Sequence, residues 1–273
     1  MHPIIHLGPV QIPCYGLIIC IGLFIGTAIA MWSSKTYNIE KLDIALSTIL
    51  AGIGLLVGAK VLYVFTVIPE IIAEFEFVKT HVFQTILYAF SGYVFYGGLI
   101  GALLGYLFYC KWFHIDFSVL INIIAPVIPL VHAFGRIGCF LGGCCYGIEY
   151  HGIFAIQFPE NEFISSLNSV PRFPVQLLEA GINFILFLVL MYYGRKKRKP
   201  YSMLGIYLIC YAIIRFFIEF LRGDVERGVF FGISTSQWIS FVLIGIGIYL
   251  LRIKPKEKTG ATEATQEQTQ ETN

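Results

Sequence analysis

Long apolar segments alternate with short polar ones along most of the chain, and this alternation is the strongest pattern in the sequence. Most of these segments are close to the length of about 20 residues with which a helix crosses a bilayer. Lipid offers no hydrogen bonds to an open backbone, so each segment is expected to form a helix. The pattern predicts seven transmembrane helices at residues 12–32, 44–67, 92–110, 119–143, 175–193, 201–220 and 236–251.

The polar segments divide the chain into one membrane domain, residues 1–253, and a tail, residues 254–273. The tail is dominated by Thr, Glu, Gln and Lys and is expected to be disordered. Two predicted outer loops, residues 68–91 and 144–174, are long enough to have structure of their own. In the first loop, Ile71, Ile72, Phe75 and Val78 would share one helical face, which predicts a helix lying at the membrane interface. The second loop is predicted to cap the outer end of the helices.

Composition supports the membrane interpretation, because 57% of the 273 residues are hydrophobic and only 13% are charged. With an external N-terminus, twelve lysines and arginines fall on the cytoplasmic side of the predicted helices and four on the opposite side. This bias predicts an external N-terminus and a cytoplasmic C-terminus. Three further basic residues, Lys60, Arg136 and Arg215, are left at membrane depth.

Arg136 follows an apolar run and lies between Gly135 and Gly138. A guanidinium at membrane depth costs about 2.5–3.5 kcal/mol on insertion scales, so it needs an anionic partner. No acid lies within a helical turn of Arg136, which favours a lipid phosphate as that partner; a buried salt bridge is the alternative. His132 and Cys139 fall on the same helical face as Arg136.

The sixth predicted span contains a second polar stripe. Tyr207, Tyr211, Arg215 and Glu219 recur at steps of four, and Arg222 follows three residues later, so all five fall on one face of the helix. Glu219 either neutralises Arg215 or contacts substrate. Two basic stripes that face one cavity are typical of a site for an anionic substrate.

Six motifs resemble those of the prolipoprotein diacylglyceryl transferase family and follow in the same order. The most specific is GRIGCFLGGCCYG at residues 135–147. Another is the Tyr-x-x-x-Arg-Phe-x-x-Glu-Phe-x-Arg pattern from Tyr211 to Arg222. The other four are PCYGL at 13–17, GAKVLY at 58–63, RFPVQLLEA at 172–180 and ISTSQ at 233–237.

The resemblance implies a multi-pass enzyme of the bacterial cytoplasmic membrane. Such an enzyme moves the diacylglyceryl group of phosphatidylglycerol to the lipobox cysteine thiol of a prolipoprotein, which forms a thioether and releases glycerol phosphate. No cofactor, metal or nucleic acid is expected. The alternatives are a paralogue with a changed acceptor and a non-enzymatic lipid or anion transporter. The predicted catalytic residues are Arg136, Arg215, Tyr96 and His132, and the predicted substrate-binding residues are Tyr15, Gly97, Gly98, Gly138, Cys139, Gly147, Tyr211, Glu219 and Arg222.

The chain departs from the family pattern at three positions. Tyr96 replaces the histidine of the third-span His-Gly-Gly-Leu motif, and Cys139 and Cys144 replace an asparagine and a glutamate of the signature. His132 either takes over the role of proton acceptor or is a neutral histidine bonded to a neighbouring helix. Cys139, Cys144 and Cys145 lack the spacing of a zinc site, and a disulfide between them is the alternative.

Overall fold

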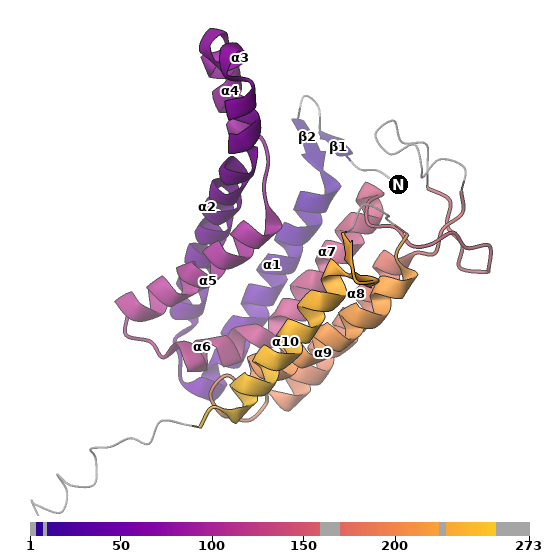
Figure 1. Cartoon of the computed structure of the whole chain (residues 1–273). Helices are drawn as coiled ribbons and strands as arrows, with labels where there is room; N and C mark the ends of the chain where they lie inside the picture. The colour runs from indigo at the N-terminus through magenta and orange to yellow at the C-terminus, as the bar shows by residue number, and fades with distance from the viewer. Residues whose placement is uncertain (1–3, 8–9, 159–169, 224–227, 255–273) are drawn as a thin grey trace, which may run out of the picture.

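The computed structural model describes residues 4–7, 10–158, 170–223 and 228–254, and nearly all of this part is helical (Figure 1). The predicted tail and part of the predicted outer cap, residues 159–169, lie outside the described residues. The helices, including short 3₁₀ helices labelled η, are α1 (Cys14–Ser33), η1 (Ser34–Tyr37), α2 (Lys41–Ala73), α3 (Phe75–Thr80), α4 (Val82–Ala89), α5 (Phe95–Trp112), α6 (Phe117–Ile124), η2 (Ala125–Val127), α7 (Ile128–Gly142), α8 (Val175–Tyr193), α9 (Ser202–Ile218), η4 (Glu219–Leu221) and α10 (Thr235–Arg252).

Among the described residues, six helical segments are long and apolar enough to cross a membrane, so the protein is a multi-pass membrane protein. They are Cys14–Tyr37, Lys41–Ala73, Phe117–Gly142, Val175–Tyr193, Ser202–Leu221 and Thr235–Arg252, and each covers one of the predicted spans. The remaining predicted span is occupied by α5, whose glycines, tyrosines and Lys111 make it less apolar. The seventh span and the orientation of the termini stay predictions.

The segment formed by α6, η2 and α7 is the most enclosed of the six, because 67% of the residues in its most apolar stretch are buried inside the protein. Sequence analysis predicts one continuous helix here, but Pro126 and Pro129 lack the N–H groups that would continue the hydrogen-bond ladder. The chain therefore passes through a 3₁₀ turn between two α-helices. Leu120, Ile124 and Leu130 from this segment form the core, packed against Ala30 of α1 and other helices.

Helices α2 and α5 pack as a close pair beside α1, on the side of the molecule away from α8, α9 and α10 (Figure 1). Glycines make this contact possible: Gly54 and Gly58 of α2 lie against the backbone of Gly97 and Gly101 of α5, and Gly105 lies against the backbone at Leu50. A methyl group at these positions would collide with the opposing helix. This arrangement follows the rule that small residues at a four-residue spacing let membrane helices approach each other closely.

The predicted interfacial helix at residues 69–78 is wrong as a single element. Pro69 lies inside α2, which continues to Ala73, and a new helix, α3, begins at Phe75. The break at Glu74 separates the apolar residues that were expected to share one face. Glu70 near the end of α2 accepts a hydrogen bond of 2.6 Å from the Tyr88 hydroxyl of α4, and this bond raises the pKa of Tyr88 to about 12.

Two short hairpins, which sequence analysis does not predict, precede the first and last long helices. Strands β1 (Ile4–Leu7) and β2 (Val10–Pro13) pair before α1, and β3 (Val229–Phe230) and β4 (Ile233–Ser234) pair before α10. Ser234 caps α10 through a reciprocal pair of hydrogen bonds with Gln237. This cap fixes the start of the helix next to Ser236, a residue of the site described below.

Candidate active site

Three ionisable side chains from α7 and α8 meet inside the helical bundle. Arg136 Nε lies 3.1 Å from Glu179 Oε1 and donates a 3.3 Å hydrogen bond to His132 Nε2. The same imidazole nitrogen lies 3.6 Å from Glu179 Oε1. Because His132 Nε2 accepts a hydrogen bond, it carries no proton in this arrangement and the imidazole is neutral. His132 is therefore bonded to Arg136 of its own helix rather than to a neighbouring helix.

Glu179 corrects the expectation that the anionic partner of Arg136 comes from outside the chain. That expectation rests on the absence of an acid near Arg136 in the sequence, whereas the carboxylate comes from the neighbouring helix α8. Arg136 therefore has a carboxylate beside it although Cys144 replaces the glutamate of the signature. Glu179 is 1% exposed, and its backbone carbonyl accepts a 2.8 Å hydrogen bond from Asn183 Nδ2. Glu179 is the one acid in an otherwise apolar helix, and an acid within a membrane span is a candidate functional residue, so the sequence could have identified it.

Arg215 of α9 occupies a second buried position. Its Nη2 atom lies 2.6 Å from Glu219 Oε2 and donates a 2.9 Å hydrogen bond to Ser236 Oγ of α10. The ion pair that sequence analysis considered for Glu219 is therefore present. The other terminal nitrogen, Nη1, is buried and has no hydrogen-bond partner among the described residues. Sequence analysis includes Ser236 in the ISTSQ motif at 233–237 but does not select it as a site residue.

Aromatic contacts bring the two polar stripes together. The rings of His132 and Tyr211 lie with centroids 5.3 Å apart, and Tyr207 stacks on Tyr211 at 5.8 Å. Glu179 lies within electrostatic range of Arg215 as well as contacting Arg136. The stripe on α7 and the stripe on α9 thus face the same interior region, with Glu179 of α8 between them.

Helix α1 contributes Tyr15 to the upper end of this region. A side chain at Gly138 of α7 would come within 3.1 Å of Cδ2 of the Tyr15 ring and 3.3 Å of the Tyr15 backbone, so the glycine allows the two helices to approach. The Tyr15 side chain is half-exposed and lies within electrostatic range of Arg136 and Cys139. The structure therefore places Tyr15 and Gly138 beside Arg136, and their role in substrate binding stays a prediction.

Gly147 and Arg222 join the loop after α7 to the end of α9. Their backbones form an isolated antiparallel bridge, and Gly147 lies directly against the backbone of Phe173 and Leu221, where a side chain would not fit. Arg172 Nη1 donates a 3.3 Å hydrogen bond to the Gly147 carbonyl. Gly147 is thus needed for close backbone packing, which holds Arg222 near the rest of the site.

The structure does not bring Tyr96 into hydrogen-bond contact with Arg136, Arg215 or His132 within the described part of the chain. Tyr96 lies in the first turn of α5, is 53% exposed and contacts Phe95 edge to face. It lies within electrostatic range of Tyr211, which links it to the stripe on α9. Its neighbours Gly97 and Gly98 lie in the contact between α5 and α2, so their visible role is helix packing. Substrate binding by these two glycines stays a prediction.

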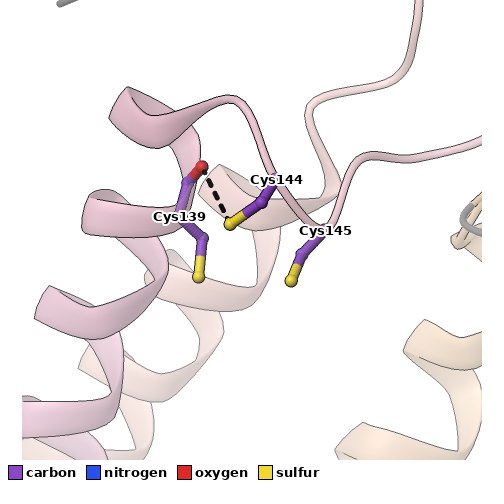
Figure 2. A group of neighbouring side chains, drawn as sticks. All are labelled: Cys139, Cys144 and Cys145. Carbon is purple, nitrogen blue, oxygen red and sulfur yellow. Dashed lines mark hydrogen bonds between the residues drawn. The ribbon is translucent and has the colours of Figure 1, made fainter. Parts of the chain in front are cut away.

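Three cysteines gather at the end of α7, although their spacing in the sequence predicts no metal site. Their sulfur atoms all lie within 4.8 Å of one another (Figure 2). Cys139 comes from the helix, whereas Cys144 and Cys145 come from the loop that follows it, and Cys144 Sγ donates a 3.7 Å hydrogen bond to the Cys139 carbonyl. The neighbouring thiols of Cys139 and Cys144, together with the nearby Arg222 guanidinium, lower the pKa of the Cys145 thiol. All three are free thiols in the structure, which does not contain the disulfide that sequence analysis left open as an alternative.

The site residues and the helices that hold them belong to a sequence pattern shared with known proteins. The family model for prolipoprotein diacylglyceryl transferase matches residues 2–253. A phosphatidylglycerol–prolipoprotein diacylglyceryl transferase of Clostridium tetani is 33% identical over 93% of this chain and 98% of its own length. A second, from Clostridium perfringens, is 35% identical over 92% of this chain and 95% of its own length, and one from Bordetella parapertussis is 29% identical over 93% and 96%. The chain therefore belongs to the prolipoprotein diacylglyceryl transferase family.

Proposed function

We propose that the protein transfers the diacylglyceryl group of phosphatidylglycerol to the lipobox cysteine thiol of prolipoproteins, in the bacterial cytoplasmic membrane. The names of its relatives specify both substrates. We further propose that α5 is a seventh membrane span, that the N-terminus is external and that the C-terminus is cytoplasmic. The support for this orientation is the uneven distribution of lysines and arginines in the sequence.

The charge of the site suits this lipid. Arg136, Arg215 and Arg222 bring three guanidinium groups to the site, two of which pair with Glu179 and Glu219. The phosphodiester of phosphatidylglycerol carries one negative charge, and guanidinium groups bind phosphate oxygens through charge-assisted hydrogen bonds. A neutral lipid such as diacylglycerol offers these guanidinium groups no anionic partner.

The observation that carries the proposal is the unpaired buried nitrogen of Arg215. Nη1 has hydrogens to donate and no partner among the described residues, although a buried donor left unpaired costs about 1–3 kcal/mol. A phosphate oxygen would satisfy it, and the guanidinium is held in place by Glu219 and Ser236. A guanidinium that is fixed before the substrate arrives stabilises developing negative charge at little reorganisation cost.

The transfer itself needs a thiolate and a stabilised leaving group. The thiolate attacks the glyceryl carbon that bears the phosphate, a carbon–sulfur bond forms, and the carbon–oxygen bond breaks with its electron pair remaining on the phosphate oxygen. Glycerol phosphate leaves with one more negative charge than the diester, and this added charge is what Arg136 and Arg215 stabilise in the transition state. His132 and Glu179 are the groups in the site that can accept the thiol proton.

A direct test supplies the purified protein with labelled phosphatidylglycerol and a lipobox peptide, and measures the release of glycerol phosphate. We expect release with the cysteine peptide and none when serine replaces that cysteine. Movement of the labelled lipid across the bilayer without any release of glycerol phosphate would instead support the transporter alternative.

A further inference from the structure

The cysteine cluster is the group of reactive side chains in the site that the transfer mechanism leaves unused. Cys139, Cys144 and Cys145 place three sulfur atoms within 4.8 Å of one another. In a tetrahedral zinc site the zinc–sulfur bonds are about 2.3 Å, which corresponds to sulfur–sulfur distances of about 3.8 Å. Side-chain movements of under about 1 Å would therefore bring the three sulfurs to the separation that such an ion requires.

The backbone around the cluster directs all three side chains to one side. Gly143 ends α7 in the left-handed conformation with φ of 73°, and Cys145 is left-handed as well with φ of 58°. Consecutive side chains in an extended chain point in opposite directions, and the left-handed residue removes this alternation. Figure 2 shows the resulting arrangement, with the side chains of Cys144 and Cys145 directed toward the end of the helix that carries Cys139.

Neighbouring helices hold the loop in this shape. Gln176 Nε2 of α8 donates a 2.8 Å hydrogen bond to the Cys144 carbonyl, and the backbone of Gly147 pairs with Arg222. The loop is thus fixed on both sides of Cys145. A rigid frame of this kind is what orients the ligands of a metal ion.

The charges around the cluster also suit a metal. Three thiolates and one divalent cation carry one net negative charge, and Arg222 and Arg136 both lie within electrostatic range of Cys145. These guanidinium groups would help to compensate that charge. Within the described residues, the cluster contains three cysteines and no fourth His, Cys, Asp or Glu, so a metal bound there would keep one exchangeable position.

We propose that Cys139, Cys144 and Cys145 form a site for one thiophilic divalent cation of the zinc type, whose fourth position is open to an incoming thiol. Binding the cation releases the three thiol protons to solvent. A fourth thiol that joins the metal also loses its proton and remains a thiolate at neutral pH. Resting on the proposed function, this site would hold the lipobox thiolate ready for attack on the lipid, while His132 or Glu179 accepts the proton that the thiol loses on binding.

The first test measures metal binding without lipid or peptide, so its outcome does not depend on the proposed function. The purified, reduced and metal-free protein is titrated with Co²⁺, and the absorption that arises from thiolate-to-cobalt charge transfer is recorded. We expect one Co²⁺ per chain, displaced by Zn²⁺, and at least tenfold weaker binding in Cys139→Ser and Cys145→Ser. The matched control is Cys20→Ser, because Cys20 is a free, exposed cysteine on α1 outside the cluster.

The metal site would be ruled out by the absence of charge-transfer absorption in folded protein, or by equal Co²⁺ binding in wild type and Cys145→Ser. The second test adds a lipobox peptide to the cobalt-loaded protein. We expect the charge-transfer absorption to increase with the cysteine peptide and to stay constant with its serine variant. A spectrum that the cysteine peptide leaves unchanged would overturn the role in thiol activation. A changed spectrum without any lipid transfer would instead contradict the proposed function.

Discussion

Replacing Glu179 by glutamine keeps the size of the side chain but removes the counter-charge of Arg136. Two unit charges 3.1 Å apart attract each other by about 5 kcal/mol at an effective dielectric constant of about 20. Desolvation of both groups offsets part of this attraction, but removal of one partner from a buried pair still costs about 3–5 kcal/mol, because the other charge is left unpaired. We therefore expect Glu179→Gln to lower the free energy of unfolding by about 3 kcal/mol or more.

The matched control is Glu149→Gln, which removes the acid of a pair at nearly the same distance but on the surface. Glu149 Oε1 lies 3.0 Å from His151 Nε2, and the two side chains are 63% and 70% exposed. Exposed pairs contribute at most about 1 kcal/mol, because solvent screens them. The assay is denaturant-induced unfolding of both variants and the wild type in the same detergent. Equal loss of stability in the two variants would refute the inference that burial makes the Arg136–Glu179 pair important.

Three further predictions concern the chemistry and the orientation. Arg136→Lys keeps the charge but loses the planar donor geometry, so turnover should fall at least tenfold in folded protein. If the variant turned over as fast as the wild type, Arg136 would have a role in packing only. His132→Gln should slow transfer more than Tyr96→Phe does, and adding Tyr96→His to the His132→Gln variant should partly restore its rate of transfer. Full activity of His132→Gln at every pH would exclude His132 as the proton acceptor. A reporter fused after Lys199 should be cytoplasmic, and a reporter near Asn161, which lies outside the described residues, should be external. The reverse result at both sites would show that the topology is inverted.

The helices themselves were largely predictable, because a helix that crosses lipid must be apolar over most of its length, so the apolar segments mark the spans. Helix α8 has the predicted bounds, Val175–Tyr193, since Pro174 and Gly194 enclose an apolar run. The prolines that divide the fourth predicted span are visible in the sequence, but the extent to which the chain bends there is not. Hydropathy alone did not detect the break at Glu74, because short helices outside the membrane follow local packing more than apolar length.

The contacts between helices were much less predictable than the helices. Helical periodicity shows that His132 and Arg136 share a face, but it does not say which helix faces them, so Glu179 was missed as the partner of Arg136. The cysteine cluster was missed for a different reason. Its geometry depends on the left-handed backbone of Cys145, which no spacing rule for metal ligands includes.

The central claim, that the arginines hold phosphatidylglycerol for attack by a lipobox thiol, is tested most directly by the mass of the peptide product. Purified protein is incubated with phosphatidylglycerol and a lipobox peptide, and the peptide is fragmented in a mass spectrometer. We predict a diacylglyceryl group attached to the cysteine sulfur, and at least tenfold less of this product with folded Arg215→Lys, whose ammonium cannot reproduce the contacts of Nη1 and Nη2. An unmodified peptide with folded wild-type protein, or equal product from Arg215→Lys, would contradict the account.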